Sequence, residues 1–402
     1  MKLRGILAGS GAVLAIGFLV LFVGGGSRHA IGLVFKPMVE DLDWERGALG
    51  IAVGVFFAIS AFFTFLAGLL ADRVPLRIIL GGGLVIASAG IGLMGLVTEP
   101  WQAVIFYGIV FGIGNGAVSI APIGVMVTRR YPNRIGLANG IAISGMGLGQ
   151  LFIISGFAAV LVTTGWRSVF AGLAVVSVVL VPIVFWALRS EETAMEPSQE
   201  GENTASGSFG KAFAVPYFWL LLATYAVCGL QDFFVATHVV AFALDTGVAP
   251  LLAGNLLAFL GLAGVVGVIA SGASSDRLGP IAAMAVCFAL RIGLFALVLI
   301  DKSVVSVTLF AVLYGVTFWT TAPLTVVFVR QVFGTRNLGA ISGLVTMVHQ
   351  VFGGLGAWLG AKDFDSQGTY DDTFTVMIAG SLVALVLTMM LARFRPPSSA
   401  AP

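Results

Sequence analysis

Long apolar runs, separated by short polar stretches, extend from one end of the chain to the other. A helix needs roughly 20 mostly apolar residues to cross the hydrocarbon core of a bilayer, and twelve runs reach or approach this length. They cover residues 6–35, 48–71, 78–97, 101–127, 135–162, 169–188, 212–244, 249–270, 281–300, 304–329, 338–359 and 374–391. The runs are continuous and do not alternate with polar residues, so the pattern predicts membrane helices and not a membrane β-barrel.

One long polar segment interrupts this pattern. Residues 190–210 hold five glutamates among Ser, Thr and Gly, a composition that cannot bury enough apolar area to form a packed core. The segment separates six apolar runs from six. We therefore predict a six-helix membrane domain over residues 1–189, a cytoplasmic linker over 190–211, and a second six-helix membrane domain over 212–402.

Composition agrees with a membrane protein. Hydrophobic residues make up 58% of the chain and charged residues 10%, whereas a soluble domain carries about a quarter charged residues. The net charge is +2 and no basic patch is present, so nucleic acid is not an expected partner. Both cysteines, Cys228 and Cys287, lie inside apolar runs, which favours small core residues over a disulfide or a metal site.

The two halves repeat a short motif. Asp72 and Arg73 follow the second apolar run, and Asp276 and Arg277 occupy the equivalent place in the second half, 204 positions later (276 − 72). A second echo supports the repeat, because Arg129, Arg134 and Gly140 recur as Arg330, Arg336 and Gly343. With the N-terminus placed inside, fourteen Lys and Arg residues fall on the cytoplasmic side and five outside, which predicts cytoplasmic termini.

The stretch Gly68 to Arg77 resembles the signature loop of the major facilitator superfamily, Gly-x-Leu-Ala-Asp-Arg-x-Gly-Arg. It departs from that pattern at Pro75 and Leu76, and the second copy lacks the trailing basic residue. The resemblance implies an all-α membrane protein with twelve transmembrane helices in two pseudo-symmetric six-helix bundles. Asp72, Arg73, Asp276 and Arg277 would form conformational-switch loops, since an Asp at a helix end can pair with cations or helix N-termini of a neighbour. The alternative is an ordinary charged cytoplasmic turn.

Several segments are similar to the monocarboxylate and oxalate porter family within that superfamily: residues 32–37, 130–140, 145–150, 333–339 and 368–371. In that register His29 falls where members carry a substrate- and proton-handling lysine, and Tyr314 and Phe318 fit the aromatic pair of helix 10. One departure matters. Val268 stands where the family commonly has an arginine that holds the substrate carboxylate. Either Arg28 or a histidine then holds the anion, or the substrate is not a simple carboxylate.

Polar residues inside the spans are the sharpest functional clues, because a charge at a helix centre costs at least ~2.5 kcal/mol on insertion scales. Arg28 and His29 follow three glycines that are expected to weaken the helix, and their charge suits an anionic substrate, although Arg28 could instead extend to the interface. Asp232 could exchange protons or form a fixed salt bridge to Arg28 or another cation. Arg291 is expected to be a structural partner. The remaining candidates for substrate binding are Asn115, Gln150, His238 and His349.

We therefore expect a secondary transporter of a small organic anion that is coupled to protons, acts by alternating access and has no other cofactor. Expected surroundings are the lipid bilayer of a bacterial inner membrane, with the protein as a monomer. An efflux antiporter of a neutral or cationic compound and a transporter-like receptor are the alternatives. An enzyme is not expected, because no metal-ligand spacing, nucleophile constellation or nucleotide-binding motif occurs.

Overall fold

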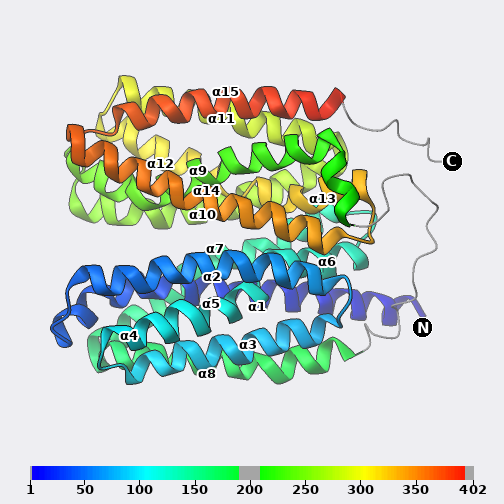
Figure 1. The fold of residues 1–402 in the computed structure, drawn as a ribbon, viewed down its shortest axis with the longest axis horizontal. Helices are drawn as coiled ribbons and strands as arrows, with labels where there is room; N and C mark the ends of the chain where they lie inside the picture. Colours follow the sequence, from blue (N-terminus) through cyan, green and yellow to red (C-terminus); the bar gives the residue numbers. More distant parts are fainter. Residues whose placement is uncertain (1, 190–208, 394–402) are drawn as a thin grey trace. The chain divides into compact units, whose positions relative to one another are not determined.

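The computed structural model describes residues 2–189 and 209–393, and every regular element in these two ranges is helical (Figure 1). Twelve helical segments within them are long and apolar enough to cross a membrane. The predicted class, an all-α protein with twelve transmembrane helices, is confirmed. Of the predicted linker, residues 190–208 lie outside the described residues, and Phe209–Ala214 form a short 3₁₀ helix, η4.

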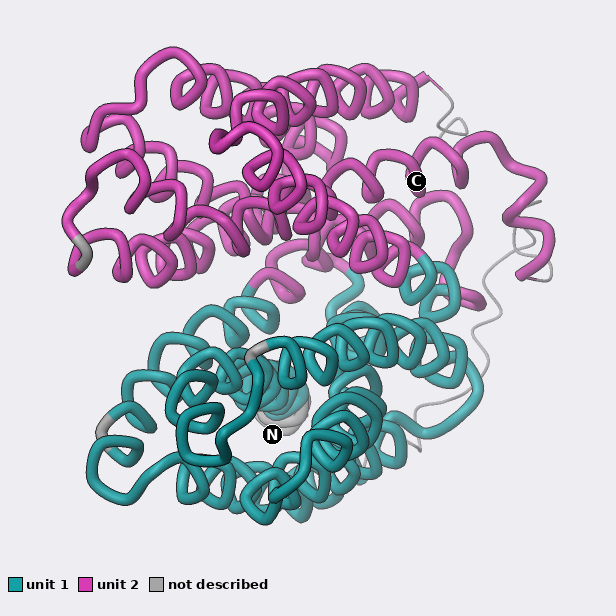
Figure 2. Tube along the Cα trace, turned by 60° about the vertical axis from the view of Figure 1, so that its left-hand side comes forward, with its two compact units in different colours: residues 1–132, 141–202, 338–344 teal, residues 133–140, 203–337, 345–402 magenta. Residues whose placement is uncertain are grey.

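The chain divides into two compact units (Figure 2). Unit 1 comprises residues 1–132, 141–202 and 338–344, and unit 2 comprises residues 133–140, 203–337 and 345–402. The first half contains α1 (Lys2–Asp41), α2 (Arg46–Ala71), α3 (Leu76–Leu93), η1 (Met94–Leu96), α4 (Pro100–Ala103), η2 (Val104–Phe111), α5 (Gly112–Ala117), α6 (Ile120–Arg130), α7 (Ile135–Thr164) and α8 (Trp166–Ala187). The second half contains α9 (Pro216–Asp245), α10 (Pro250–Leu278), α11 (Pro280–Ile300), α12 (Val304–Phe318), α13 (Thr321–Phe333), α14 (Leu338–Gln367) and α15 (Asp371–Arg393).

Each unit has its own aromatic core. In unit 1, Phe56 of α2 stacks on Phe111, with ring centroids 5.3 Å apart, and also packs on Tyr107. In unit 2, Phe295 of α11 packs on Phe310 and Tyr314 of α12. Large apolar side chains that point away from these cores remain exposed, as expected for surfaces that face lipid.

Glycines in α1 serve packing and do not break the helix. The expectation that Gly24 to Gly26 weaken the first span is wrong, because α1 runs without interruption from Lys2 to Asp41. A Cβ atom at Gly25 would strike the backbone of Met146 in α7, and one at Gly26 would strike the side chain of Ile153. The glycines therefore allow α1 and α7 to approach closely.

The fourth and tenth spans, predicted as continuous helices, are each interrupted near the middle. In the fourth, α5 ends at Ala117 and α6 begins at Ile120; in the tenth, α12 ends at Phe318 and α13 begins at Thr321. The two breaks lie 201 positions apart (321 − 120), the same offset as Arg129 and Arg330. A proline follows each break, at Pro122 and Pro323. Proline has no N–H to donate to the preceding turn, so it favours an interruption at both positions.

Candidate functional site

The carboxylate of Asp232 lies at the centre of a buried polar cluster in unit 2. Its Oδ1 atom is 2.7 Å from Nη2 of Arg291 and accepts a hydrogen bond from the hydroxyl of Tyr314 at 3.0 Å. Its Oδ2 atom accepts from Sγ of Cys228 at 3.3 Å and lies 3.2 Å from Nε2 of His349. These side chains come from α9, α11, α12 and α14, so the cluster joins four membrane helices.

Arg291 is fully buried, and its donors are all engaged. Nε donates to Oγ1 of Thr317 at 3.1 Å, Nη2 donates to the carbonyl of Thr317 at 2.9 Å, and Nη1 donates to Oε1 of Gln231 at 3.2 Å. Gln231 in turn donates to Oγ of Ser381 in α15. A buried charge needs such partners to offset its lost hydration. The structure therefore pairs Asp232 with Arg291, which is the salt bridge to another cation that the sequence left open for Asp232.

Close contact between α9 and α14 brings His349 to Asp232. A Cβ atom at Gly229 would collide with the backbone of His349, and one at Gly356 would collide with the backbone of Leu230. Only glycine lets the two backbones approach this far. The side chain of His349 keeps 20% of its area exposed, whereas that of Asp232 keeps 3%.

His238 lies on the same helix as Asp232 but belongs to a different set of contacts. Its Nε2–H donates to the carbonyl of Ala357 at 2.8 Å, and the hydroxyl of Tyr370 lies 3.3 Å from its Nδ1. Both ring nitrogens of His238 thus have a hydrogen-bond partner. Phe318 packs on Tyr314, with ring centroids 6.5 Å apart, so this predicted aromatic pair does lie together.

Arg28 and His29 lie side by side in the middle of the first span, in unit 1. The Arg28 guanidinium lies over the ring of Phe57, 5.0 Å from its centroid, and near Phe56 at 5.9 Å. Tyr107 donates to the Arg28 carbonyl at 3.1 Å. His29 bonds through Nδ1 to the Gly25 carbonyl at 2.8 Å. A carbonyl only accepts, so Nδ1 carries the hydrogen and Nε2 is the nitrogen that can take a proton.

The two softer candidates of unit 1 lie on other helices. Asn115 of α5 is buried, and its Oδ1 atom accepts a hydrogen bond from the hydroxyl of Ser60 at 3.2 Å. Gln150 of α7 is half-buried. The Asn115 contact joins α5 to α2.

Asp72 and Asp276 each cap the N-terminus of a membrane helix. Within unit 1, Asp72 accepts hydrogen bonds from the N–H groups of Gly339 at 3.0 Å and Ala340 at 2.9 Å, and Arg129 lies 3.7 Å from it. Within unit 2, Asp276 accepts hydrogen bonds from the first turn of α7, from Gly136 and Leu137, at 2.8 Å each. A carboxylate at this end of a helix is stabilised by the unpaired N–H groups and the helix dipole.

Burial raises the pKa of the Asp72 carboxyl above its usual value. The N–H groups of Ala340 and Gly339 and the Arg129 guanidinium oppose this shift. The predicted loop cations Arg73 and Arg277 follow the two capping residues directly in the chain. The two N–H groups and Arg129 thus stabilise the Asp72 carboxylate, while burial removes it from water and has the larger effect on its pKa.

The structure shows four partners of the candidate residues that were not identified from the sequence. They are Cys228, Gln231, Thr317 and Tyr107. Cys228 precedes Asp232 by one helical turn, and Thr317 follows Tyr314 by three residues. Such spacings place side chains on one helical face. Neither spacing distinguishes a functional partner from ordinary packing, which is why only the folded structure identifies them.

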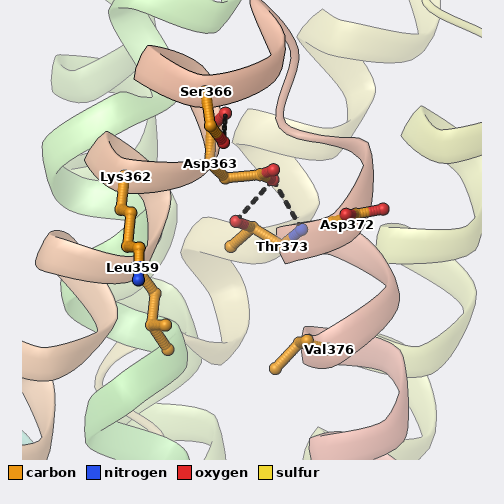
Figure 3. Close-up of a pocket in the computed structure, with 7 residues that line it drawn as sticks. All are labelled: Leu359, Lys362, Asp363, Ser366, Asp372, Thr373 and Val376. Atoms are coloured by element: carbon orange, nitrogen blue, oxygen red, sulfur yellow. Dashed lines mark hydrogen bonds between the residues drawn. The ribbon is translucent and has the colours of Figure 1, made fainter.

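A shallow pocket lies at the ends of α14 and α15 (Figure 3). Its lining residues are Leu359, Lys362, Asp363, Ser366, Asp372, Thr373 and Val376. Asp363 accepts hydrogen bonds from the backbone N–H and the hydroxyl of Thr373, both at 2.8 Å, and so caps the start of α15. None of the candidate site residues lies in this pocket.

Comparisons with known proteins agree with this architecture. The chain is 24% identical over 373 residues to monocarboxylate transporter 13 of Rattus norvegicus, covering 90% of this chain and 85% of that protein. It is 23% identical over 350 residues to the uncharacterized MFS-type transporter YcxA of Bacillus subtilis, covering 85% of each. Among solved structures, the E. coli fucose:proton symporter FucP matches with a TM-score of 0.69 at 13% identity, over 94% of this chain and 98% of that one. The sequence profile of the Major Facilitator Superfamily matches residues 17–357. With that match over most of its length, the chain belongs to the Major Facilitator Superfamily.

Proposed function

We propose that this protein is a secondary transporter that moves a small organic anion together with a proton by alternating access. Membership of the superfamily supports transport. The name of the rat relative, a monocarboxylate transporter, supports an organic anion as the substrate. The observation that carries the proposal is the arrangement of the cations at mid-span. Arg28 and His29 are adjacent in the middle of the first span, and His29 holds its Nδ1–H on the Gly25 carbonyl.

The pair Arg28 and His29 supplies a physical coupling between anion and proton. A guanidinium disfavours a second positive charge on the neighbouring imidazole, and a carboxylate bound to the guanidinium removes that penalty. His29 would take the proton on Nε2, because Nδ1–H is held by the Gly25 carbonyl. Anion and proton then bind more tightly together than either does alone.

Of the two proton sites predicted from the sequence, we assign coupling to His29. The ion pair with Arg291 at 2.7 Å and the hydrogen bond from the hydroxyl of Tyr314 hold the Asp232 carboxylate in a fixed position. Asp232 then holds α9 to α11 and α12 and does not release its partner during transport. His238, Asn115, Gln150, Tyr314, Phe318 and His349 stay candidates for contacts with the substrate.

Uptake into proteoliposomes tests this function. We expect accumulation of labelled monocarboxylates when the outside is more acidic than the inside, and little uptake without the gradient. Arg28→Gln should abolish anion binding at every pH, because it removes a permanent charge. His29→Gln should weaken binding strongly at acidic pH and little at pH 8, since His29 carries a charge only when both of its ring nitrogens are protonated.

Lys36→Gln is the matched control, because it removes an exposed cation from the same helix. Normal anion affinity in Arg28→Gln across the pH range would overturn the assignment. Uptake of cations or neutral compounds against a proton gradient would favour the antiporter alternative, and saturable binding with no uptake would favour a receptor. The inner-membrane location and the cytoplasmic termini remain predictions from the charge bias, and reporter fusions to each end would test the termini.

A further inference from the structure

Three potential metal ligands of different chemistry face one another in unit 2. They are Sγ of Cys228, Oδ2 of Asp232 and Nε2 of His349, and the three atoms all lie within 4.8 Å of one another. Cys228 and Asp232 are one turn apart on α9, and His349 reaches them from α14 through the glycine contact. This group was not expected from the sequence, which favoured a simple packing role for Cys228.

Two of the three separations between the ligand atoms, those from Oδ2 of Asp232, suit a tetrahedral ion. Bonds of about 2.3 Å to sulfur and about 2.0 to 2.2 Å to nitrogen and oxygen place the ligand atoms of tetrahedral zinc about 3.3 to 3.6 Å apart. In the structure Sγ lies 3.3 Å and Nε2 lies 3.2 Å from Oδ2. A small ion could therefore replace the hydrogens now shared between these atoms with little movement of the helices.

The two oxygens of Asp232 have different partners, and this arrangement makes Oδ2 available to an ion. Oδ1 is held by Arg291 and Tyr314, whereas Oδ2 faces Cys228 and His349. Nη1 of Arg291 lies 3.6 Å from Sγ of Cys228, and metal binding would displace the thiol proton to give the thiolate ligand. The positive charges of a divalent ion and Arg291 exceed the negative charges of the thiolate and the carboxylate by one. An anionic fourth ligand would balance this remaining charge.

The ligand chemistry and the access route restrict the kind of ion. Mg²⁺ and Ca²⁺ prefer oxygen ligands alone, whereas a mixed set of sulfur, nitrogen and oxygen suits Zn²⁺ and softer ions. Cys228 and Asp232 are buried, and His349 is partly exposed, so the open fourth position lies on the side of His349. We infer that Cys228, Asp232 and His349 form a binding site for one thiophilic divalent cation of the Zn²⁺ class, which ties α9 to α14.

Metal binding to the purified, detergent-solubilised full chain tests this inference without any transport assay, so it is independent of the proposed function. We expect one equivalent of Zn²⁺ by calorimetry, one equivalent of Cd²⁺ with the ultraviolet charge-transfer band of a cadmium–thiolate bond, and a higher thermal midpoint with either ion. Cys228→Ser should abolish the band and weaken binding at least tenfold. His349→Gln should weaken binding about as much while keeping the band.

Two controls use the same residue types elsewhere in unit 2. The variants Cys287→Ser and His238→Gln should bind both ions as the unaltered protein does, because neither side chain is one of the three proposed ligands. Absence of a one-to-one complex in the unaltered protein would overturn the site. So would a cadmium–thiolate band that survives Cys228→Ser or disappears in Cys287→Ser, since the thiolate would then be a different one.

Discussion

The carboxylate of Asp232 lies 2.7 Å from the guanidinium of Arg291, although the two residues belong to different membrane helices and both side chains are buried. Removing one partner of a buried ion pair leaves the other charge buried without compensation, which typically costs about 3 to 5 kcal/mol. We expect Asp232→Asn and Arg291→Gln each to lower the free energy of unfolding by that amount. The double variant should be less destabilised than the worse of the two single variants. Chemical unfolding in detergent measures all three.

An exposed ion pair in the same unit provides the control. Lys302 and Asp371 lie 2.5 Å apart, and both remain partly open to solvent. Exposed pairs contribute about 0 to 1 kcal/mol, so Lys302→Gln should change stability little. Equal losses at both pairs would contradict the view that burial makes the Asp232 pair important.

A second prediction concerns the pH dependence of stability through Asp72. Burial raises its pKa in the folded protein, so the folded state binds this proton more tightly than the unfolded state does. The ionised carboxylate therefore lowers stability as pH rises through the window between the unfolded and the folded pKa. Asp72→Asn cannot ionise. Its thermal midpoint should match that of the unaltered protein below about pH 4 and exceed it at neutral pH.

Glu45→Gln serves as a comparison, because Glu45 is exposed and its side chain caps no helix. This variant should follow the unaltered protein at both pH values. A lower midpoint for Asp72→Asn at neutral pH would show that the hydrogen bonds from Gly339 and Ala340 outweigh the effect of burial.

Transport rates give a third prediction for the same contacts. Asp72 and Asp276 hold the first turns of α14 and α7, and we propose that these contacts form and break when the transporter changes state. Asp72→Asn and Asp276→Asn should therefore slow turnover several-fold while changing the substrate affinity little. Rates of uptake and equilibrium binding measured on the same preparation separate the two effects, and unchanged uptake in well-folded variants would count against a switching role.

Glycine packing between α9 and α14 supplies a fourth prediction with a built-in control. Gly356→Ala places a methyl group against the backbone of Leu230, and overpacking of this kind costs about 1 to 3 kcal/mol. Gly354→Ala, two residues away on the same helix, meets no atom within 4 Å. Its better helix propensity should leave stability unchanged or raise it by up to about 1 kcal/mol. Similar losses in both variants would show that the close approach of the helices is not the cause.

The broken spans give the last prediction. Pro323→Ala supplies the N–H group that the tenth span lacks after its break and should favour a continuous helix. If bending at this position accompanies transport, the variant should show a higher thermal midpoint and a several-fold slower turnover. Pro182→Ala is the control, because α8 continues through Pro182 without a break. Faster or unchanged transport in Pro323→Ala would remove the break from the mechanism.

The sequence alone determined the number of spans, because a bilayer requires long apolar runs and each run is visible in the printed residues. It also identified the repeat, the Asp72 and Asp276 motifs and every charged residue at mid-span, since charges are rare in such runs. For Asp232 the sequence left two roles open, proton exchange and a fixed salt bridge, and it did not identify the cation that forms the salt bridge. The sequence also failed to show that the fourth and tenth spans are interrupted, although Pro122 and Pro323 were available as signals.

Only the tertiary structure decided which of these residues meet. Asp232 and Arg291 are 59 positions apart (291 − 232) and Asp232 and His349 are 117 apart, and helical periodicity relates residues within one helix only. Which face of one helix meets which face of another depends on close packing, here on Gly229 and Gly356. In the sequence, Cys228 and Thr317 are small residues within apolar runs and Gln231 is an amide next to Asp232, and nothing in the pattern marks them as partners of a charge. They become polar partners only because that packing turns them toward the Asp232 carboxylate and the Arg291 guanidinium, where a buried charge requires them.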